Sequence, residues 1–245
     1  MMMLGSLRAS LKADLHLHTR EAEASVAHDA RGLIDRAAGE GFRVLSITNH
    51  DEVTWSAELA DYAQDRGIVL IPGVEATIEG RHVLVYNADV SVARLQTFAD
   101  LRRYRTPDWL VIAPHPFFPA TFSLRDQLLK EIDLFDAIEF SHFYTPRVDF
   151  NRPAVRLARA AGLPLIGTSD SHFAEQFGTT FSVIEAEASV ESVLDAIRKR
   201  QVGVVSRPLG YWRCASIAAR SLLAGGQHRA RRAQEQPLPA TLVGP

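Results

Sequence analysis

The stretch "DLHLHT", residues 14–19, ends the first apolar run of the chain and carries two histidines, His16 and His18, at alternate positions. Side chains two residues apart on a β-strand point to the same face. We therefore expect the two imidazoles to lie side by side where the strand stops, able to bind one cation together. A lone histidine at such a place is more often a hydrogen-bonded structural residue, so a metal site requires similar residues at the ends of the other strands.

Outward from this stretch, short apolar runs alternate with amphipathic segments. The runs rich in Val, Ile and Leu predict buried strands at 43–48, 68–73, 82–87, 109–114, 136–141 and 163–169. Apolar spacing typical of helices covers 29–41, 56–67, 92–104, 124–133, 152–162 and 189–200. This alternation predicts βα units in an α/β fold with a parallel sheet, either a barrel or an open doubly wound sheet. No G-x-G-x-x-G comes after the first strand, which disfavours the open sheet.

Composition narrows the class of protein. The chain has 245 residues, 47% of them hydrophobic, which suits one large domain. Its 27 basic and 29 acidic residues give a net charge of -2, so no general basic excess points to nucleic acid. The single cysteine, Cys214, excludes an internal disulfide and a thiolate zinc cluster. No apolar run is long enough to span a membrane and no secretory signal is evident, so we expect a cytoplasmic protein.

Potential metal ligands stand at the end of almost every predicted strand. They are His16 and His18, His50 in "ITNHDE", Glu75 in "GVEAT", His115 in "APHP", His142 in "EFSH", and Asp170 and His172 in "GTSDSH". The carboxyl ends of parallel strands share one face, where sites are built. Since zinc takes about four ligands, the set predicts two or three divalent ions, and imidazole with carboxylate suits Zn, Mn or Fe. Clustered divalent ions are a device for cleaving phosphate esters.

With these motifs in order, the chain resembles the PHP (polymerase and histidinol phosphatase) family, in its stand-alone phosphoesterase type, over about residues 11–206. The resemblance implies a distorted (β/α)7 barrel with a trinuclear site at the carboxyl ends of the strands. We accordingly expect a barrel domain at 1–208, and after it, at 209–245, a C-terminal helix within 214–226 and a flexible tail.

The resemblance also implies how the ligands divide. His16, His18, Glu75 and Asp170 would hold one ion, and Glu75 would bridge to a second ion at His115 and His142. His50 and His172 would hold the third, with Glu23 as a further ligand and Glu21 and His28 as alternatives to it. His82 is an additional candidate for the site. Asn49 stands where the family usually has aspartate, and we expect it to orient His50 by accepting a hydrogen bond.

The expected activity is hydrolysis of a phosphate ester by a metal-bridging hydroxide. Asp170, His142 and Arg20 are the expected catalytic residues. His142 is a candidate for the leaving-group acid, as are His82 and a metal-bound water, and Arg20 is the first candidate for the charge-stabilising cation, followed by Arg147 and Arg207. The expected partner is a small phosphorylated substrate, or a nucleotide or oligonucleotide. Two alternatives stay open: a C–N hydrolase of the amidohydrolase type, and a catalytically silent metal-binding module. The amidohydrolase type usually needs a lysine at a middle strand end, where this chain has none. The sequence does not indicate an oligomeric state.

Overall fold

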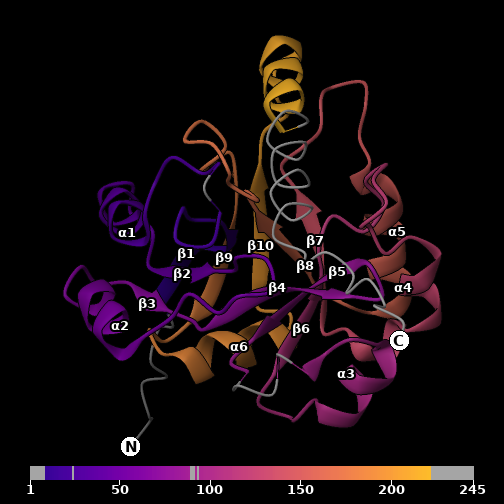
Figure 1. The fold of residues 1–245 in the computed structure, drawn as a ribbon, viewed down its shortest axis with the longest axis horizontal. Coiled ribbons are helices and arrows are strands. Elements are labelled where there is room, and N and C mark those ends of the chain that lie inside the picture. Colours follow the sequence, from indigo (N-terminus) through magenta and orange to yellow (C-terminus); the bar gives the residue numbers. More distant parts are fainter. Residues whose placement is uncertain (1–8, 24, 89–91, 93, 222–245) are drawn as a thin grey trace, which may run out of the picture.

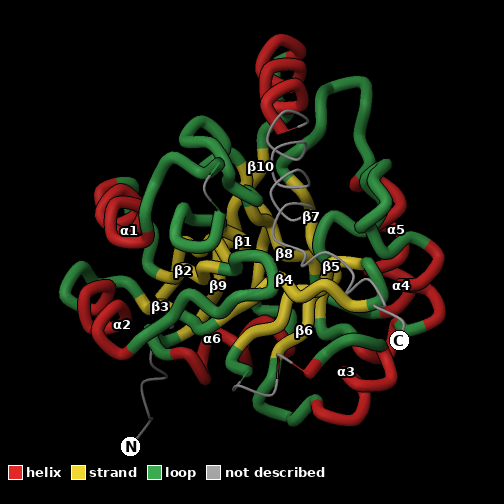
Figure 2. The backbone as a smooth tube through the Cα atoms, viewed as in Figure 1, coloured by secondary structure: helices red, strands yellow, loops and turns green. Residues whose placement is uncertain are grey.

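The fold is seen in a computed structural model, which describes residues 9–23, 25–88, 92 and 94–221. Its strands form two five-stranded sheets over this part of the chain, in the orders β10-β9-β1-β2-β3 and β4-β5-β6-β7-β8. The sheets lie at the centre of the molecule and the helices surround them (Figures 1 and 2). The first sheet contains β1 (Ala9–Leu17), β2 (Val44–Ile47), β3 (Val69–Leu70), β9 (Thr180–Ala186) and β10 (Val202–Ser206). The second contains β4 (Gly73–Ile78), β5 (Arg81–Tyr86), β6 (Leu110–Ala113), β7 (Ala137–Ser141) and β8 (Leu165–Thr168).

The predicted helices are present but several are shorter than expected. They are α1 (Ala30–Gly39), α2 (Ala57–Gln64), α3 (Phe98–Tyr104), α4 (Asp126–Lys130), α5 (Asn151–Ala161) and α6 (Val190–Arg198), with a 3-10 turn at Ile132–Leu134. Side chains cap four of their first turns: Asp29 for α1, Ser56 for α2, Thr97 in a capping box with Asp100 for α3, and Ser189 for α6. The cap at Thr97 explains why the helix predicted from residue 92 begins only at Phe98.

The expected (β/α)7 barrel is not confirmed, because no closed barrel is detected among the described strands and these strands are not all parallel. β4 pairs with β5, and β5 with β6, in antiparallel fashion. Only Glu79 and Gly80 separate β4 from β5, and both have positive φ, 49° and 72°, as in a type I′ hairpin turn. A connection of two residues cannot make a parallel crossover. β9 likewise pairs antiparallel with both β1 and β10.

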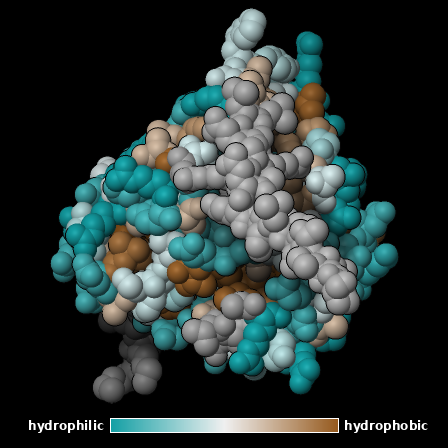
Figure 3. Space-filling view, in the orientation of Figure 1, coloured by the Kyte–Doolittle hydropathy of each residue, from teal (hydrophilic) through white to brown (hydrophobic). Residues whose placement is uncertain are grey.

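Three apolar clusters hold the layers together. One lies between the two sheets and includes Leu15, Leu84 and Ile166, all fully buried. The second packs α3 and α5 against the second sheet, and the third packs α1 and α2 against the first. At full burial each aliphatic side chain contributes roughly 1.5–3 kcal/mol. The outer face in Figure 3 is mainly hydrophilic, with apolar side chains in small separate groups.

The sheets meet closely at two points that matter for the site. The backbone of β1 bridges to the segment after β8 through Leu17 and Ser171, and the segment after β2 bridges to β4 through His50 and Glu75, both in parallel fashion. Tyr86 of the second sheet also donates a hydrogen bond to the Leu15 carbonyl of the first, at 2.8 Å. The carboxyl ends of β1, β2 and β8 are therefore held beside β4 at one rim.

The C-terminal part agrees with expectation where the structure describes it. Residues 211–221 are helical and overlap the helix predicted at 214–226. The boundary predicted at residue 208 stays a prediction, and the predicted flexible tail beyond residue 221 lies outside the described residues. Within the described part of the chain, no helix is long and apolar enough to cross a membrane.

Candidate metal centre

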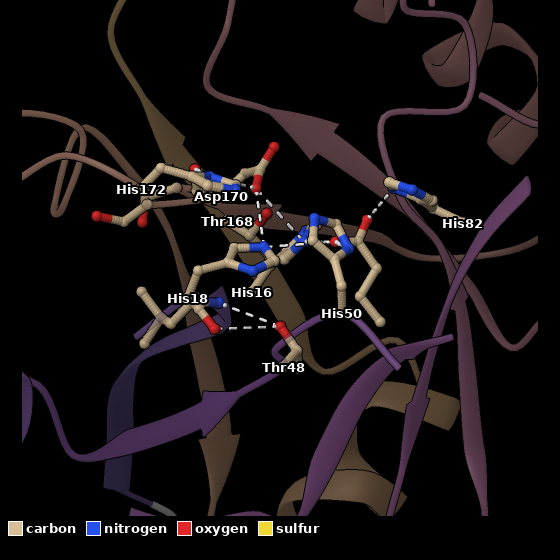
Figure 4. A network of polar contacts seen from close by, with 12 residues as sticks. His16, His18, Thr48, His50, His82, Thr168, Asp170 and His172 are labelled. Atoms are coloured by element: carbon tan, nitrogen blue, oxygen red, sulfur yellow. Dashed lines mark hydrogen bonds and ion pairs between the residues drawn. The ribbon is translucent and has the colours of Figure 1, made fainter. Parts of the chain in front are cut away.

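The histidines and carboxylates predicted from separate strands gather at this rim (Figure 4). His16 and His18 come from the end of β1, and Asp170 and His172 from the turn after β8. The backbone turns abruptly at Asp170, where φ is 43°, and at His115, where it is 28°. Non-glycine residues rarely adopt positive φ, and such strain concentrates at functional sites. Here the strained turns hold the segments that carry the imidazole of His115 and the carboxylate of Asp170 at the cluster.

Glu75 lies at the centre of the cluster, on the hairpin strand β4, and is almost fully buried. One of its oxygens, Oε2, lies 3.2 Å from His16 Nε2, 3.4 Å from His18 Nε2 and 3.0 Å from His50 Nδ1. The other, Oε1, lies 3.0 Å from His115 Nε2. The two oxygens thus face two different sets of imidazoles, which is the geometry that a carboxylate bridging two cations needs.

The spacing of the donor atoms fits a bound cation. Two ligands that each lie about 2.1 Å from one tetrahedral ion are about 3.4 Å apart. His16 Nε2 and His18 Nε2 lie 3.2 and 3.4 Å from Glu75 Oε2, and 3.5 and 3.2 Å from Asp170 Oδ1. Both nitrogens are buried and have no hydrogen-bond partner among the described residues. Buried imidazole nitrogens that have no hydrogen-bond partner and lie at this spacing are typical of metal ligands.

A second group of ligands surrounds Glu23. Its carboxylate lies 2.5 Å from His18 Nδ1, 3.3 Å from His172 Nε2 and 4.0 Å from His50 Nε2. These four residues form one of the groups whose ligand atoms lie close enough to share an ion. The alternatives to Glu23 lie elsewhere, since Glu21 accepts a hydrogen bond from the first residue of α1 and His28 contacts the His18 carbonyl.

Two predicted site residues are engaged by partners other than Glu75 and Glu23. His142 is buried, but its Nε2 contacts the Gln176 amide at 3.0 Å, and it belongs to none of the groups that could share an ion among the described residues. Arg20 extends to Asp29, the cap of α1, at 2.5 Å, and its side chain is 57% exposed. Their catalytic roles, and the metal role of His142, stay predictions. The expectation that Asn49 orients His50 finds no support, because Asn49 instead bonds Thr19 and Thr54.

Sequence reasoning missed two buried carboxylates beneath the cluster. Glu139, in β7, accepts hydrogen bonds from His16 Nδ1 at 2.7 Å, from the His115 backbone at 2.5 Å and from Thr168. Asp14 accepts from the backbone of Ser169 at 3.1 Å. The sequence did contain a signal for both, because each is an acidic residue inside an otherwise apolar strand run, where an ionisable group needs partners.

Charge compensation governs the titration of the cluster. Burial by itself lowers the pKa of His16, but nearby carboxylates, first Glu75 and then Asp170, outweigh it and hold that pKa well above its ordinary value. Burial raises the pKa of Glu75, but the imidazoles around it, first that of His82, hold it well below its ordinary value. For Asp14, burial outweighs the hydrogen bonds from Ser169 and the nearby charge of His16, and it raises the pKa of Asp14 to about 7. The cluster is thus built to keep its central carboxylates ionised.

Comparisons with known proteins agree with this geometry. A family model described as PHP-associated (PHP_C) matches residues 149–202. The chain is 27% identical over 145 residues to an uncharacterised protein of Methanocaldococcus jannaschii, covering 55% of this chain and 83% of that protein. It is 38% identical over 72 residues to a 3',5'-nucleoside bisphosphate phosphatase of Chromobacterium violaceum, covering 29% of this chain and 25% of that one.

Among solved structures, the fold is similar to a two-domain protein from Bacteroides vulgatus that contains a predicted PHP-like metal-dependent phosphoesterase. The TM-score is 0.63 at 21% identity, over 82% of this chain and 66% of that chain. The chain therefore spans about two thirds of that protein and a quarter of the Chromobacterium phosphatase.

Proposed function

We propose that the chain is a metal-dependent phosphoesterase of the PHP type that hydrolyses a small phosphate monoester, a nucleotide or an oligonucleotide end, and the PHP-associated match at residues 149–202 and the PHP-like fold support this. The observation that carries the proposal is the position of Glu75, whose two oxygens face two sets of imidazoles. Two or three divalent ions, of Zn, Mn or Fe type, would supply charge neutralisation and a nucleophile at neutral pH. We also propose a cytoplasmic enzyme, on the ground of the single cysteine.

The chain's own residues would divide the work. His16, His18 and Asp170 would hold one ion with Glu75, and Glu23, His50 and His172 would hold another. Glu139 accepts from His16 Nδ1, so in the neutral imidazole the nitrogen without a proton is Nε2, which is directed at Glu75. Arg20 would reach a substrate phosphate only by leaving Asp29, so its role as the stabilising cation depends on that ion pair opening.

The C–N hydrolase is the weaker alternative. Enzymes of that type usually place a lysine at a middle strand end, and the three lysines here lie elsewhere. Lys12 donates to the Glu40 carbonyl at 3.0 Å, Lys199 pairs with Asp195 at 2.6 Å, and Lys130 is an exposed residue at the end of α4. A silent module is also disfavoured, because decayed sites lose ligands and this chain retains candidate ligands at the ends of β1, β2, β6 and β8.

The test is a phosphate-release screen over nucleotides, sugar phosphates and short oligonucleotides, with Mn, Zn and Fe added separately. The Asp170→Asn variant is expected to lose bound metal and at least about a hundredfold in activity, because it removes a charged ligand. The Asp61→Asn variant, at an exposed position of α2, is the matched control and is expected to retain both. Full activity of Asp170→Asn with an unchanged metal content would refute the proposal.

A further inference from the structure

Basic residues are concentrated at the C-terminal end of the chain. Residues 206–245 contain six arginines and one acidic residue, although the chain as a whole has 29 acidic and 27 basic residues. Such a charge imbalance between parts of a chain points to a polyanionic partner. Resting on the proposed function, we propose that residues 207–221, the C-terminal arm, bind single-stranded nucleic acid, so that the substrate of the metal centre is an oligonucleotide.

The C-terminal arm is anchored to the loop after β7. Its side chains Leu209 and Ile217 are only 3% and 1% exposed. The Leu209 backbone N–H donates to the Tyr144 carbonyl at 2.8 Å, and the hydroxyl of Ser206, directly before the arm, donates to the Tyr144 hydroxyl at 3.1 Å. Tyr144 lies two residues after His142, just beyond the end of β7. The arm therefore begins on a loop that leaves the rim of the metal centre.

Arg220 holds the other end of the arm against the turn after β8. Its guanidinium lies 4.1 Å from the centre of the Phe173 ring and pairs with Glu175. Phe173 follows directly after His172, a candidate ligand of the metal centre. The helix of the arm stands at the top of the view in Figure 1, where β10 ends. A strand bound along the arm would thus have the metal centre close to its end.

Two aromatic side chains at the start of the arm's helix lie open to solvent. Trp212 is 90% exposed and Tyr211 is 53% exposed. An indole ring usually buries most of its surface, because that surface is largely apolar. Exposed rings beside cationic side chains form the platforms on which successive bases of a single strand stack. Trp212 and Tyr211 are therefore positioned to stack on bases.

Arginines without an acidic partner supply the positive charge. Three exposed arginines of the arm and the loop after β7 have no ion-pair partner among the described residues, namely Arg147, Arg207 and Arg213. The acidic residues of the neighbouring segments pair with other arginines, Asp149 with Arg152 at 3.7 Å and Glu175 with Arg220. The guanidinium groups of the three exposed arginines can therefore pair with phosphates of a bound strand.

Nucleic acid fits this surface better than a membrane does. An anionic membrane would attract the same arginines. The metal centre beside the arm, however, requires a phosphate ester that can reach the nearly buried Glu75. A single strand carries such a group at its end and further phosphates along its length. The exposed rings and the guanidinium groups match the two repeating parts of that strand, its bases and its phosphates.

The test measures binding of a fluorescein-labelled oligothymidylate of about twelve nucleotides, with phosphorothioate linkages, to the metal-loaded protein by fluorescence anisotropy. Trp212→Ala is expected to weaken binding about 5- to 100-fold, because a stacked base is lost, and Trp212→Phe to retain most of the affinity. Arg213→Gln should reduce the slope of log affinity against log salt by about 0.7, the value for one phosphate of a single strand. Arg103→Gln, at an exposed position of α3, makes the same change of charge away from the arm and should alter neither quantity.

The outcomes separate this inference from the proposed function. Equal affinities and equal salt slopes of the wild-type chain, Trp212→Ala and Arg213→Gln would overturn the inference, and so would binding to phosphatidylserine vesicles without binding to the oligonucleotide. A wild-type chain that releases phosphate from small monoesters but does not bind the oligonucleotide would overturn the inference alone. A chain that binds the oligonucleotide through the arm but releases no phosphate from any substrate would overturn the proposed function and leave the binding arm in place.

Discussion

Replacing Glu139 by Gln tests how the buried carboxylate controls the metal centre. All three of its partners are donors: His16 Nδ1, Thr168 Oγ1 and the His115 backbone N–H. In glutamine an NH2 group replaces one of the two oxygens, and this NH2 group must face either His115 or His16. Facing His115, it would meet a backbone N–H that cannot turn away. Facing His16, it would force the imidazole to protonate Nε2, which is the nitrogen directed at Glu75. The second choice costs less, because Thr168 can rotate its hydroxyl.

The expected magnitude depends on this choice. A changed His16 tautomer should weaken metal binding about 10- to 100-fold, or about 1.4–2.8 kcal/mol. One buried group left without a good partner should also cost the metal-free protein about 1–3 kcal/mol in unfolding free energy. Metal affinity is measured by competition with a chromophoric chelator, and stability by urea unfolding after metal removal.

The matched control is Tyr86→Phe, which removes a buried hydrogen bond to the Leu15 carbonyl without changing the tautomer of a ligand. It should lower stability by about 0.5–1.5 kcal/mol and leave metal affinity unchanged. If Glu139→Gln binds metal as tightly as the wild-type chain, the reasoning that Glu139 sets the His16 tautomer is wrong.

Two further predictions concern protons and packing. In the metal-free protein the pKa values of His16 and His18 stand well above 6.5, so their protonation stabilises the fold fully below pH 6.5, and this stabilisation is lost as pH rises through the raised values. Metal binding near pH 7 should therefore release protons, and metal affinity should increase as pH rises. Calorimetry in two buffers of different ionisation enthalpy measures the number of protons released. Metal binding without proton release would contradict this prediction. Gly167→Ala should destabilise by about 1–3 kcal/mol, because the added Cβ would lie 2.8 Å from the Phe181 carbonyl and from Val204. Gly203→Ala, with nothing within 4 Å, is the control in urea unfolding, and equal stabilities of the two variants would refute the packing argument.

Local pattern predicted the strands that carry ligands because each is a buried run that ends in a polar residue. Periodicity therefore located β1, β2, β6, β7 and β8 to within a few residues. It also placed His16, His18 and Asp170 correctly at strand ends, since the carboxyl ends of these parallel strands do share a rim. These features depend only on neighbouring residues in the chain.

The parts that were missed depend on long-range pairing. The residues of β9 and β10 have ordinary apolar spacing, and only their pairing with β1 shows that the sheet continues with antiparallel strands. Similarly, His142 comes after a strand as the other ligands do, but Gln176, 34 residues later, occupies its nitrogen. Sequence position can bring a side chain to the rim, but the hydrogen bonds made there decide what the side chain can bind.

The β4–β5 hairpin explains why Glu75 reaches both halves of the cluster. A parallel βα unit would leave its carboxylate at a strand end beside only its two neighbours. Instead, β4 lies at the edge of the second sheet, and the His50 bridge joins it to the end of β2 in the first. Glu75 therefore stands between the sheets, and its partner strand β5 brings His82 to the same oxygen that contacts His115. The antiparallel pairing of β4 with β5 thus gives this chain its central carboxylate and places His82 beside it.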